Sequence, residues 1–238
     1  GLLTTAELEE GQIKTYRKQI DGWYERLTKS EEAVIRNSAY FMLAGRAIGD
    51  GQYEKAQEYL DRMPNRNDAP DKRMLQANIY LNQNRAEEAA KLLEQMLLTA
   101  VNDVQMILYK LIDANYALGE KETADYVAGR VTKLAELFDL NRYNSVLASF
   151  IVAVANKDIR QTVEVLRNMF ESMTSVWNAK ASPLYRRVTA DDTGVSMESM
   201  LVPLLRELRQ EPEYEYLRND EEFQKLLAEW EEKFSAKE

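Results

Sequence analysis

Carboxylate side chains come closest to a reactive arrangement in this sequence. Asp192-Thr193-Gly194 has the form of a loop that holds a catalytic aspartate, and Glu31-Glu32, Glu87-Glu88 and Glu221-Glu222 are acidic pairs. Hydrolysis by paired aspartates needs two such loops whose carboxyl groups share a proton, and this sequence has one copy. The acidic pairs fall near expected helix starts, where negative charge favours the helix dipole. We therefore expect no catalytic residue among these groups.

Two residue types that support most protein chemistry are missing altogether. The 238 residues include no histidine and no cysteine, so the commonest general base and the commonest zinc and copper ligands are absent. Disulfides and thiol nucleophiles are absent for the same reason. We expect a protein that is not an enzyme and that holds no cofactor and no metal. An all-helical enzyme is an alternative only if charged side chains gather in a groove.

Charge and hydropathy narrow the range of partners. Aspartate and glutamate number 40 against 31 lysines and arginines, which gives a net charge of −9. Affinity for nucleic acid comes largely from cationic contacts to phosphates, so we expect no direct nucleic-acid contact by this chain. The longest apolar run, 146–155, is too short to cross a bilayer, so no membrane is expected. The absence of cysteine fits a cytoplasmic location.

A short pattern recurs three times in the first half of the chain. It is centred on Ala56, Ala89 and Ala124, which follow one another at intervals of 33 and 35 residues. Self-similarity at this period is typical of helical repeat arrays, in which stacked helix pairs build a binding surface. The sequence therefore predicts a binding module.

The spacing inside each repeat predicts how its two helices meet. A small or apolar residue stands twelve positions before each of these alanines, at Ala44, Ala77 and Ile112. Small residues at both places let paired helices approach closely. The turns carry Gly51, Asn84 and Gly119 at positions that need a positive φ. We expect an all-α fold, a right-handed stack of antiparallel helix pairs.

The chain divides into three regions on this pattern. We expect an N-terminal helix region at 1–35, repeats at 36–175 and a C-terminal helical cap at 176–238. The four repeats cover about 36–68, 69–101, 102–138 and 142–175, and the fourth has Thr162 or Val163 in place of the small alanine. The third pair is expected to begin near Asn102-Asp103, because both residue types favour helix N-caps.

The repeat residues match a known family. The matching positions are Tyr40, Leu43, Ala44, Gly51, Tyr53, Ala56, Leu60, Ala77, Tyr80, Ala89, Leu93, Leu111, Gly119 and Ala124. The stretch 36–170 thereby resembles the tetratricopeptide repeat family, with departures at Ile112, Asn115 and Ala128. A helical hairpin array of another repeat class is the alternative.

The end of the chain carries a second resemblance. Ser182-Pro-Leu-Tyr-Arg-Arg187, a leucine-striped helix and Tyr216-Leu-Arg-Asn-Asp-Glu-Glu-Phe-Gln-Lys-Leu-Leu227 follow one another. This order is similar to the C-terminal regulatory region of Gram-positive helix-turn-helix regulators of the XRE type. That resemblance implies a DNA-binding domain that is absent from this chain, repeats that sense a peptide or another ligand, and a homodimer formed through the C-terminal helices.

The tetratricopeptide resemblance also implies a site. In that family the first helix of each pair lines the concave face, where amide and phenol groups suit a peptide backbone. The corresponding ligand-binding residues are Asn78, Asn82, Tyr109, Asp113 and Tyr116. Residues such as Trp177, Trp230 and Phe234 are expected to close the end of the core; exposed together, they would form a dimer patch.

We therefore expect a non-enzymatic protein- or peptide-binding and dimerisation module, the sensor part of a helix-turn-helix transcriptional regulator. A free-standing tetratricopeptide adaptor that scaffolds protein complexes is the alternative.

Overall fold

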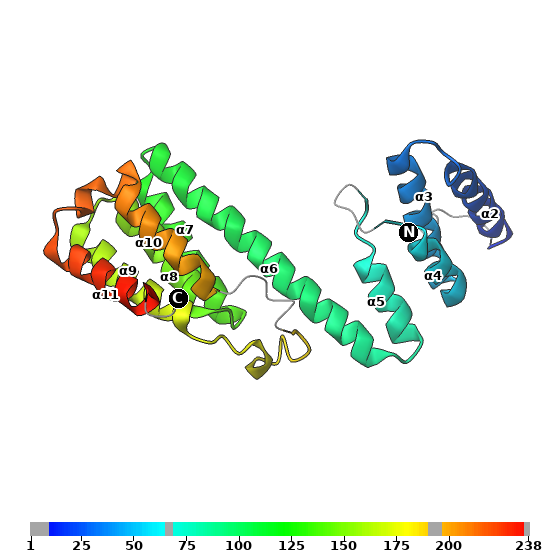
Figure 1. The fold of residues 1–238 in the computed structure, drawn as a ribbon. Coiled ribbons are helices and arrows are strands. Elements are labelled where there is room, and N and C mark those ends of the chain that lie inside the picture. The colour runs from blue at the N-terminus through cyan, green and yellow to red at the C-terminus, as the bar shows by residue number, and fades with distance from the viewer. Residues whose placement is uncertain (1–9, 65–68, 190–196, 236–238) are drawn as a thin grey trace. The chain divides into compact units, whose positions relative to one another are not determined.

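The computed structural model describes residues 10–64, 69–189 and 197–235, and these residues contain helices and no strand (Figure 1). The all-α prediction is confirmed for this part of the chain. The helices are α2 (Glu10–Leu27), α3 (Ala33–Gly49), α4 (Tyr53–Asp61), α5 (Arg73–Asn82), α6 (Ala86–Ala117), α7 (Lys121–Leu137), α8 (Arg142–Ala155), α9 (Ile159–Thr174), α10 (Leu201–Gln210) and α11 (Glu221–Ser235). Short 3₁₀ segments are η1 (Ala179–Ala181), η3 (Met197–Met200) and η4 (Pro212–Leu217).

The chain forms two compact units, an N-terminal unit (Gly1–Met96) and a C-terminal unit (Leu97–Glu238). In the N-terminal unit, α3 packs against α2 and α4, and α5 packs against α3 and α4. The core of this unit is built from Leu43, Tyr59, Leu60, Met63 and Ile79 with the small alanines between them. Its helices follow one another as antiparallel neighbours.

The C-terminal unit contains two larger clusters. In the first, α7 packs against α8, and Tyr109 and Ile112 of α6 share a core with Val131 of α7 and Ala148 of α8. In the second, α8 and α9 pack with α10, η4 and α11 (Figure 1), and Phe170 and Phe223 are fully buried. The segment after α9 thus shares a core with the last helix pair.

The turns between paired helices repeat one geometry. Gly51, Asn84 and Gly119 have φ values of 72°, 60° and 77°, which confirms the predicted left-handed positions. The N–H of the residue that follows each of them donates to the carbonyl five residues earlier, at 2.8, 2.8 and 2.9 Å. This is the hydrogen bond of a Schellman turn, which ends a helix and reverses the chain. Asp139 and Lys157 make the same turn after α7 and α8.

The alanines that define the repeat are fully buried. Ala56, Ala89 and Ala124 expose none of their surface, and neither do Ala44 and Ile112, two of the residues twelve positions earlier. A larger side chain at these alanines has no room unless the helices separate. The predicted close approach of paired helices is therefore present in both units.

Helix α6 differs from the expectation. The sequence predicts a new helix near Asn102-Asp103, whereas α6 continues without a break from Ala86 to Ala117. Asparagine and aspartate stabilise a helix start only where the preceding chain leaves the helix. Residues 97–103 contain no glycine or proline to cause that break. The second helix of the predicted second pair and the first helix of the third are thus one helix.

Two glycines of the C-terminal unit give a matched test of the turn. We expect Gly119→Ala to lower the free energy of unfolding by about 1 kcal/mol, because its φ of 77° is unfavourable for an L-residue. Gly129 lies inside α7, with no atom within 4 Å of an added Cβ. Gly129→Ala is expected to raise stability by about 0.5–1 kcal/mol. Urea unfolding followed by circular dichroism measures both; a Gly119→Ala variant that is as stable as the unchanged chain, or more stable, would contradict the turn assignment.

No described helix is both long enough and apolar enough to cross a membrane.

Candidate functional site

Asn78 and Asn82, the first two predicted site residues, lie one turn apart on α5. The Asn82 side-chain N–H donates to the Asn78 carbonyl at 2.8 Å, and its oxygen accepts from the Tyr53 hydroxyl at 2.9 Å. Asn82 is exposed and Asn78 is half-buried. The amide of Asn82 therefore fixes the end of α5 against the start of α4.

The other three predicted residues lie on the second half of α6. Tyr109 is buried, and its hydroxyl donates to the Asn144 carbonyl at 2.7 Å. Burial raises the pKa of Tyr109, so its hydroxyl stays protonated. Asp113 is exposed and pairs with Lys110 at 3.2 Å. Tyr109 thus serves mainly to pack α6 against α8.

Tyr116 takes part in a small hydrogen-bond network. Its hydroxyl donates to Asp125 at 2.6 Å and accepts from the Asn156 side chain at 2.9 Å. Burial and the hydrogen bond to Asp125 raise the pKa of Tyr116 to about 12. Asn156 also donates to the carbonyl of Val152 at 2.8 Å, which is the bond that Asn82 makes within α5. In each unit, therefore, a tyrosine of one helix pair is hydrogen-bonded to the asparagine at the end of a helix in the next pair. These contacts are Tyr53 with Asn82 and Tyr116 with Asn156.

The five predicted residues therefore fall in both units. Asn78 and Asn82 belong to the N-terminal unit, whereas Tyr109, Asp113 and Tyr116 belong to the C-terminal unit. All five are engaged in contacts with other helices or with their own helix, and Asn82 and Asp113 are the two that are exposed. A single concave surface made of all five stays a prediction.

A hollow of about 310 Å³ opens between α5 and the first turns of α6 in the N-terminal unit. Charged, amide, aromatic and apolar groups share its wall. The lining residues are Lys72, Arg73, Gln76, Tyr80, Glu88, Lys91, Leu92 and Gln95. Ligand sites commonly combine apolar and aromatic surface with a few polar groups that orient the ligand.

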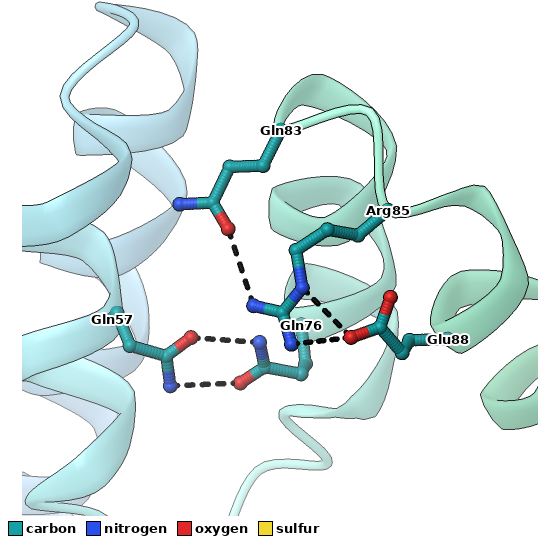
Figure 2. Close-up of polar contacts among 5 residues, drawn as sticks. All are labelled: Gln57, Gln76, Gln83, Arg85 and Glu88. Atoms are coloured by element: carbon teal, nitrogen blue, oxygen red, sulfur yellow. Dashed lines mark hydrogen bonds and ion pairs between the residues drawn. The ribbon is translucent and has the colours of Figure 1, made fainter.

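One wall of the hollow is fixed by a pair of glutamines, which Figure 2 shows facing each other from α4 and α5. The Gln57 amide donates to Gln76 at 2.9 Å and the Gln76 amide donates back to Gln57 at 2.7 Å. Gln57 also donates to Asp61 at 2.9 Å. Two reciprocal hydrogen bonds between half-buried amides hold Gln76 in one orientation. The Gln76 side chain is therefore positioned before any ligand arrives.

Two other lining residues, Tyr80 and Glu88, are held by Arg85, whose polar contacts Figure 2 shows. Its Nε and Nη2 donate to one oxygen of Glu88 at 2.9 and 2.7 Å, and Nη1 donates to Gln83 at 3.4 Å. The guanidinium also lies over the Tyr80 ring, 4.3 Å from its centre. The hydrogen bond from Arg85 holds the pKa of Glu88 below its usual range. Tyr80 and Glu88 are thus held in place by the same arginine.

Three cationic side chains line the hollow, but they are not equally available. The Lys72 ammonium donates to the carbonyls of Leu60 and Met63, at 2.8 and 2.7 Å, and Arg73 pairs with Asp71 at 2.8 Å. Lys91 is exposed, and among the described residues it has no hydrogen-bond or ion-pair partner. Lys91 is therefore the cation that can bind an incoming anion with the least rearrangement.

The arrangement suits recognition of a carboxylate next to an amide and an apolar group. Lys91 supplies charge, Gln76 supplies an amide, and Tyr80 and Leu92 supply apolar surface. The side chains of the hollow can therefore bind and orient a ligand.

A second hollow, of about 300 Å³, lies in the C-terminal unit. Its wall includes Asn102, Asn141 and Asn144 beside Trp177. The Asn141 side chain is already used as the N-cap of α8, where it accepts from the Tyr143 N–H at 2.9 Å. This hollow has amide and aromatic groups but only one ionisable acid, Glu198, and no cation.

The other sequence candidates do not add a site. Asp192-Thr193-Gly194 lies outside the described residues. Within the described ranges, no three acidic side chains come together in a way that could hold a metal ion. Trp230 is buried between Phe170 and Phe234, with ring centres 5.4 and 6.3 Å away. It closes the core of the C-terminal unit as expected, so it does not contribute to an exposed aromatic patch.

Sequence reasoning missed the hollow because its residues fall beside the repeat positions. Gln57 directly follows Ala56 and Gln76 directly precedes Ala77, so both amides are neighbours of buried alanines. A polar side chain next to a tightly packed position is the signal that could have drawn attention to them. Lys91 carries no such signal, since isolated lysines on helices are usually solvated.

No protein-family model, curated protein or solved structure matches this chain.

Proposed function

We propose that the chain is a non-enzymatic peptide-binding module of the tetratricopeptide type, and that the hollow between α5 and α6 receives an acidic segment of its partner. The hollow is the main support, because it combines the unpaired Lys91 with a positioned amide and an aromatic ring. The repeated Schellman turns and the fully buried alanines support the assignment to a tetratricopeptide-like array.

The charge distribution favours an acidic partner. The whole chain carries a net charge of −9, so an acidic peptide has no general attraction to its surface. Among the lining residues of the hollow, Lys72, Arg73 and Lys91 are cationic and Glu88 is acidic, and Arg73 also pairs with Asp71. Binding of an acidic peptide would thus be directed to this place by local charge.

The resemblance of the C-terminal stretch to XRE-type regulators gives the proposal a setting. In that setting the chain is the sensor part of a cytoplasmic transcriptional regulator, and peptide occupancy changes the arrangement of DNA-binding domains on other segments. Helix α9 shares a core with α10 and α11, so these two helices cover the last helix pair of the array. An array that ends in this way has a fixed number of repeats, which suits a sensor domain.

Charge reversal at Lys91 tests the hollow. We expect a fluorescein-labelled glutamate-rich peptide to bind the full chain, and Lys91→Glu to weaken that binding about 10-fold or more. The reason is that the variant loses a charge-assisted hydrogen bond and places a second carboxylate beside Glu88. Fluorescence anisotropy at low salt measures the affinity.

Lys133→Glu is the matched control, since Lys133 is an exposed lysine of α7 and the change in net charge is the same. A lysine-rich peptide of equal length controls for the sign of the ligand charge. Equal weakening by Lys91→Glu and Lys133→Glu would show that binding follows net charge, and would contradict the proposed site.

A further inference from the structure

Helix α6 has two apolar faces in its second half. One face, which includes Val101, Tyr109 and Ile112, is buried in the C-terminal unit. The other face carries Val104, Ile107 and Leu111, with exposed fractions of 44%, 66% and 44%, and these three residues are called the α6 stripe. Three large apolar side chains in a line on a helix indicate an interaction surface, because isolated exposed residues would not align.

The spacing of the stripe indicates what kind of partner fits. Exposed Ala100 and Ala114 lie on the same line, so apolar residues alternate at intervals of four and three residues from Ala100 to Ala114. This is the a/d pattern of a heptad, which follows a second helix wound along the first. A helix, and not an extended strand or a loop, is therefore the occupant that the stripe is spaced to receive.

The stripe is self-complementary in size when two copies run antiparallel. With Val104 of one copy opposite the partner's Ile107, Ala100 falls opposite the partner's Leu111. The twofold axis repeats both pairings in the reverse order. Val104 and Ile107 thus pack on each other in the two central layers, and Ala100 packs on Leu111 in the layer on either side. Pairing a small side chain with a large one lets two helices pack closely.

The charges beside the stripe agree with the same register. Asp103 and Lys110 lie on one edge of the stripe, seven residues apart. In the antiparallel register each Asp103 faces the partner's Lys110, and the twofold axis makes this pair twice. Lys110 now pairs with Asp113 of its own helix, but its side chain is 78% exposed, so that pair contributes little and can be exchanged.

We infer that two copies of this chain associate through antiparallel pairing of their α6 stripes. This goes beyond peptide binding, since the stripe lies in the C-terminal unit and shares no residue with the hollow. It also differs from the predicted pairing through the C-terminal helices, where Trp230 is already buried in the core. In this register the paired residues run from Ala100 to Leu111 and cover about 17 Å of helix, at 1.5 Å per residue, so we expect a small contact and a reversible dimer of about micromolar affinity.

Sedimentation of the full chain over about two decades of concentration around the micromolar range tests the association. We expect a monomer–dimer equilibrium, and an Ile107→Asp/Leu111→Asp variant that stays monomeric at every concentration. Met106→Asp is the matched control, because Met106 is 58% exposed on the same turn but lies off the stripe. Circular dichroism and thermal melting establish that the variants are folded. A wild-type chain that is monomeric throughout would overturn the inference.

Chemical cross-linking tests the direction of pairing, since the chain has no cysteine of its own. Asp103→Cys and Lys110→Cys are purified separately, mixed and treated with a short bis-maleimide. The mixture is expected to give at least about 10-fold more cross-linked heterodimer than either variant gives of homodimer. The reason is that like positions are offset by about 10 Å along the helix in the antiparallel register. Equal yields, or cross-linking of one variant with itself, would overturn the antiparallel register.

Discussion

The Phe170→Ala variant is expected to lose about 3–5 kcal/mol of unfolding free energy from the C-terminal unit. Phe170 is fully buried, and its ring lies 5.4 Å from that of Trp230. It therefore connects the last helix pair, through α9, to α11 near the end of the chain. Removing the ring leaves a cavity in the core that α9 shares with α10 and α11.

Urea unfolding, followed by circular dichroism and by the fluorescence of Trp177 and Trp230, measures this loss. Tyr126→Ala is the control, because Tyr126 lies on α7 with 60% of its side chain exposed. We expect the control to cost less than about 1 kcal/mol. Similar losses in both variants would mean that the segment 197–235 does not share a core with α9.

The Ile112→Ala variant is expected to lose about 2–5 kcal/mol. Ile112 is fully buried among Tyr109, Val127 and Val131, where α6 meets α7. Ile112 stands twelve positions before Ala124. The other two repeats have an alanine, Ala44 or Ala77, at this position, so the variant also tests whether this repeat needs a larger side chain there. The free energy of unfolding is measured at concentrations at which the chain is monomeric.

Met106→Ala is the matched change on the same helix, since Met106 is more than half exposed. It is expected to cost less than about 1 kcal/mol. A larger loss at Met106 than at Ile112 would show that the buried face of α6 has been assigned wrongly.

The features that depend on nearby residues were predictable from the sequence. Gly51, Asn84 and Gly119 take positive φ because the turn geometry demands it within a few residues. Ala56 and Ala89 are buried because their spacing repeats the packing of one helix pair. Both signals lie within a single repeat, so no knowledge of distant contacts was needed.

The continuity of α6 could not be predicted in the same way. Asn102-Asp103 favours a helix start, but it does not by itself end the helix before it. Helix α6 also has two apolar faces, so periodicity alone did not say that Tyr109 is buried while Ile107 is exposed. The sequence therefore indicated Tyr109 as a ligand contact, whereas its hydroxyl binds the carbonyl of Asn144.

The hollow depends on contacts between helices, which local patterns do not specify. Gln57 and Gln76 are 19 residues apart, and their reciprocal hydrogen bonds exist only because α4 and α5 pack together. The stacking of Arg85 on Tyr80 likewise depends on the turn that brings the start of α6 back over α5.

The most direct test of the proposed function is an NMR titration of the isotope-labelled full chain with the glutamate-rich peptide. We expect the largest amide shifts between Lys72 and Gln95, around the hollow, and small shifts elsewhere. Shifts that concentrate instead around Asn102, Asn144 and Trp177, or that are absent from the whole chain, would contradict peptide binding between α5 and α6.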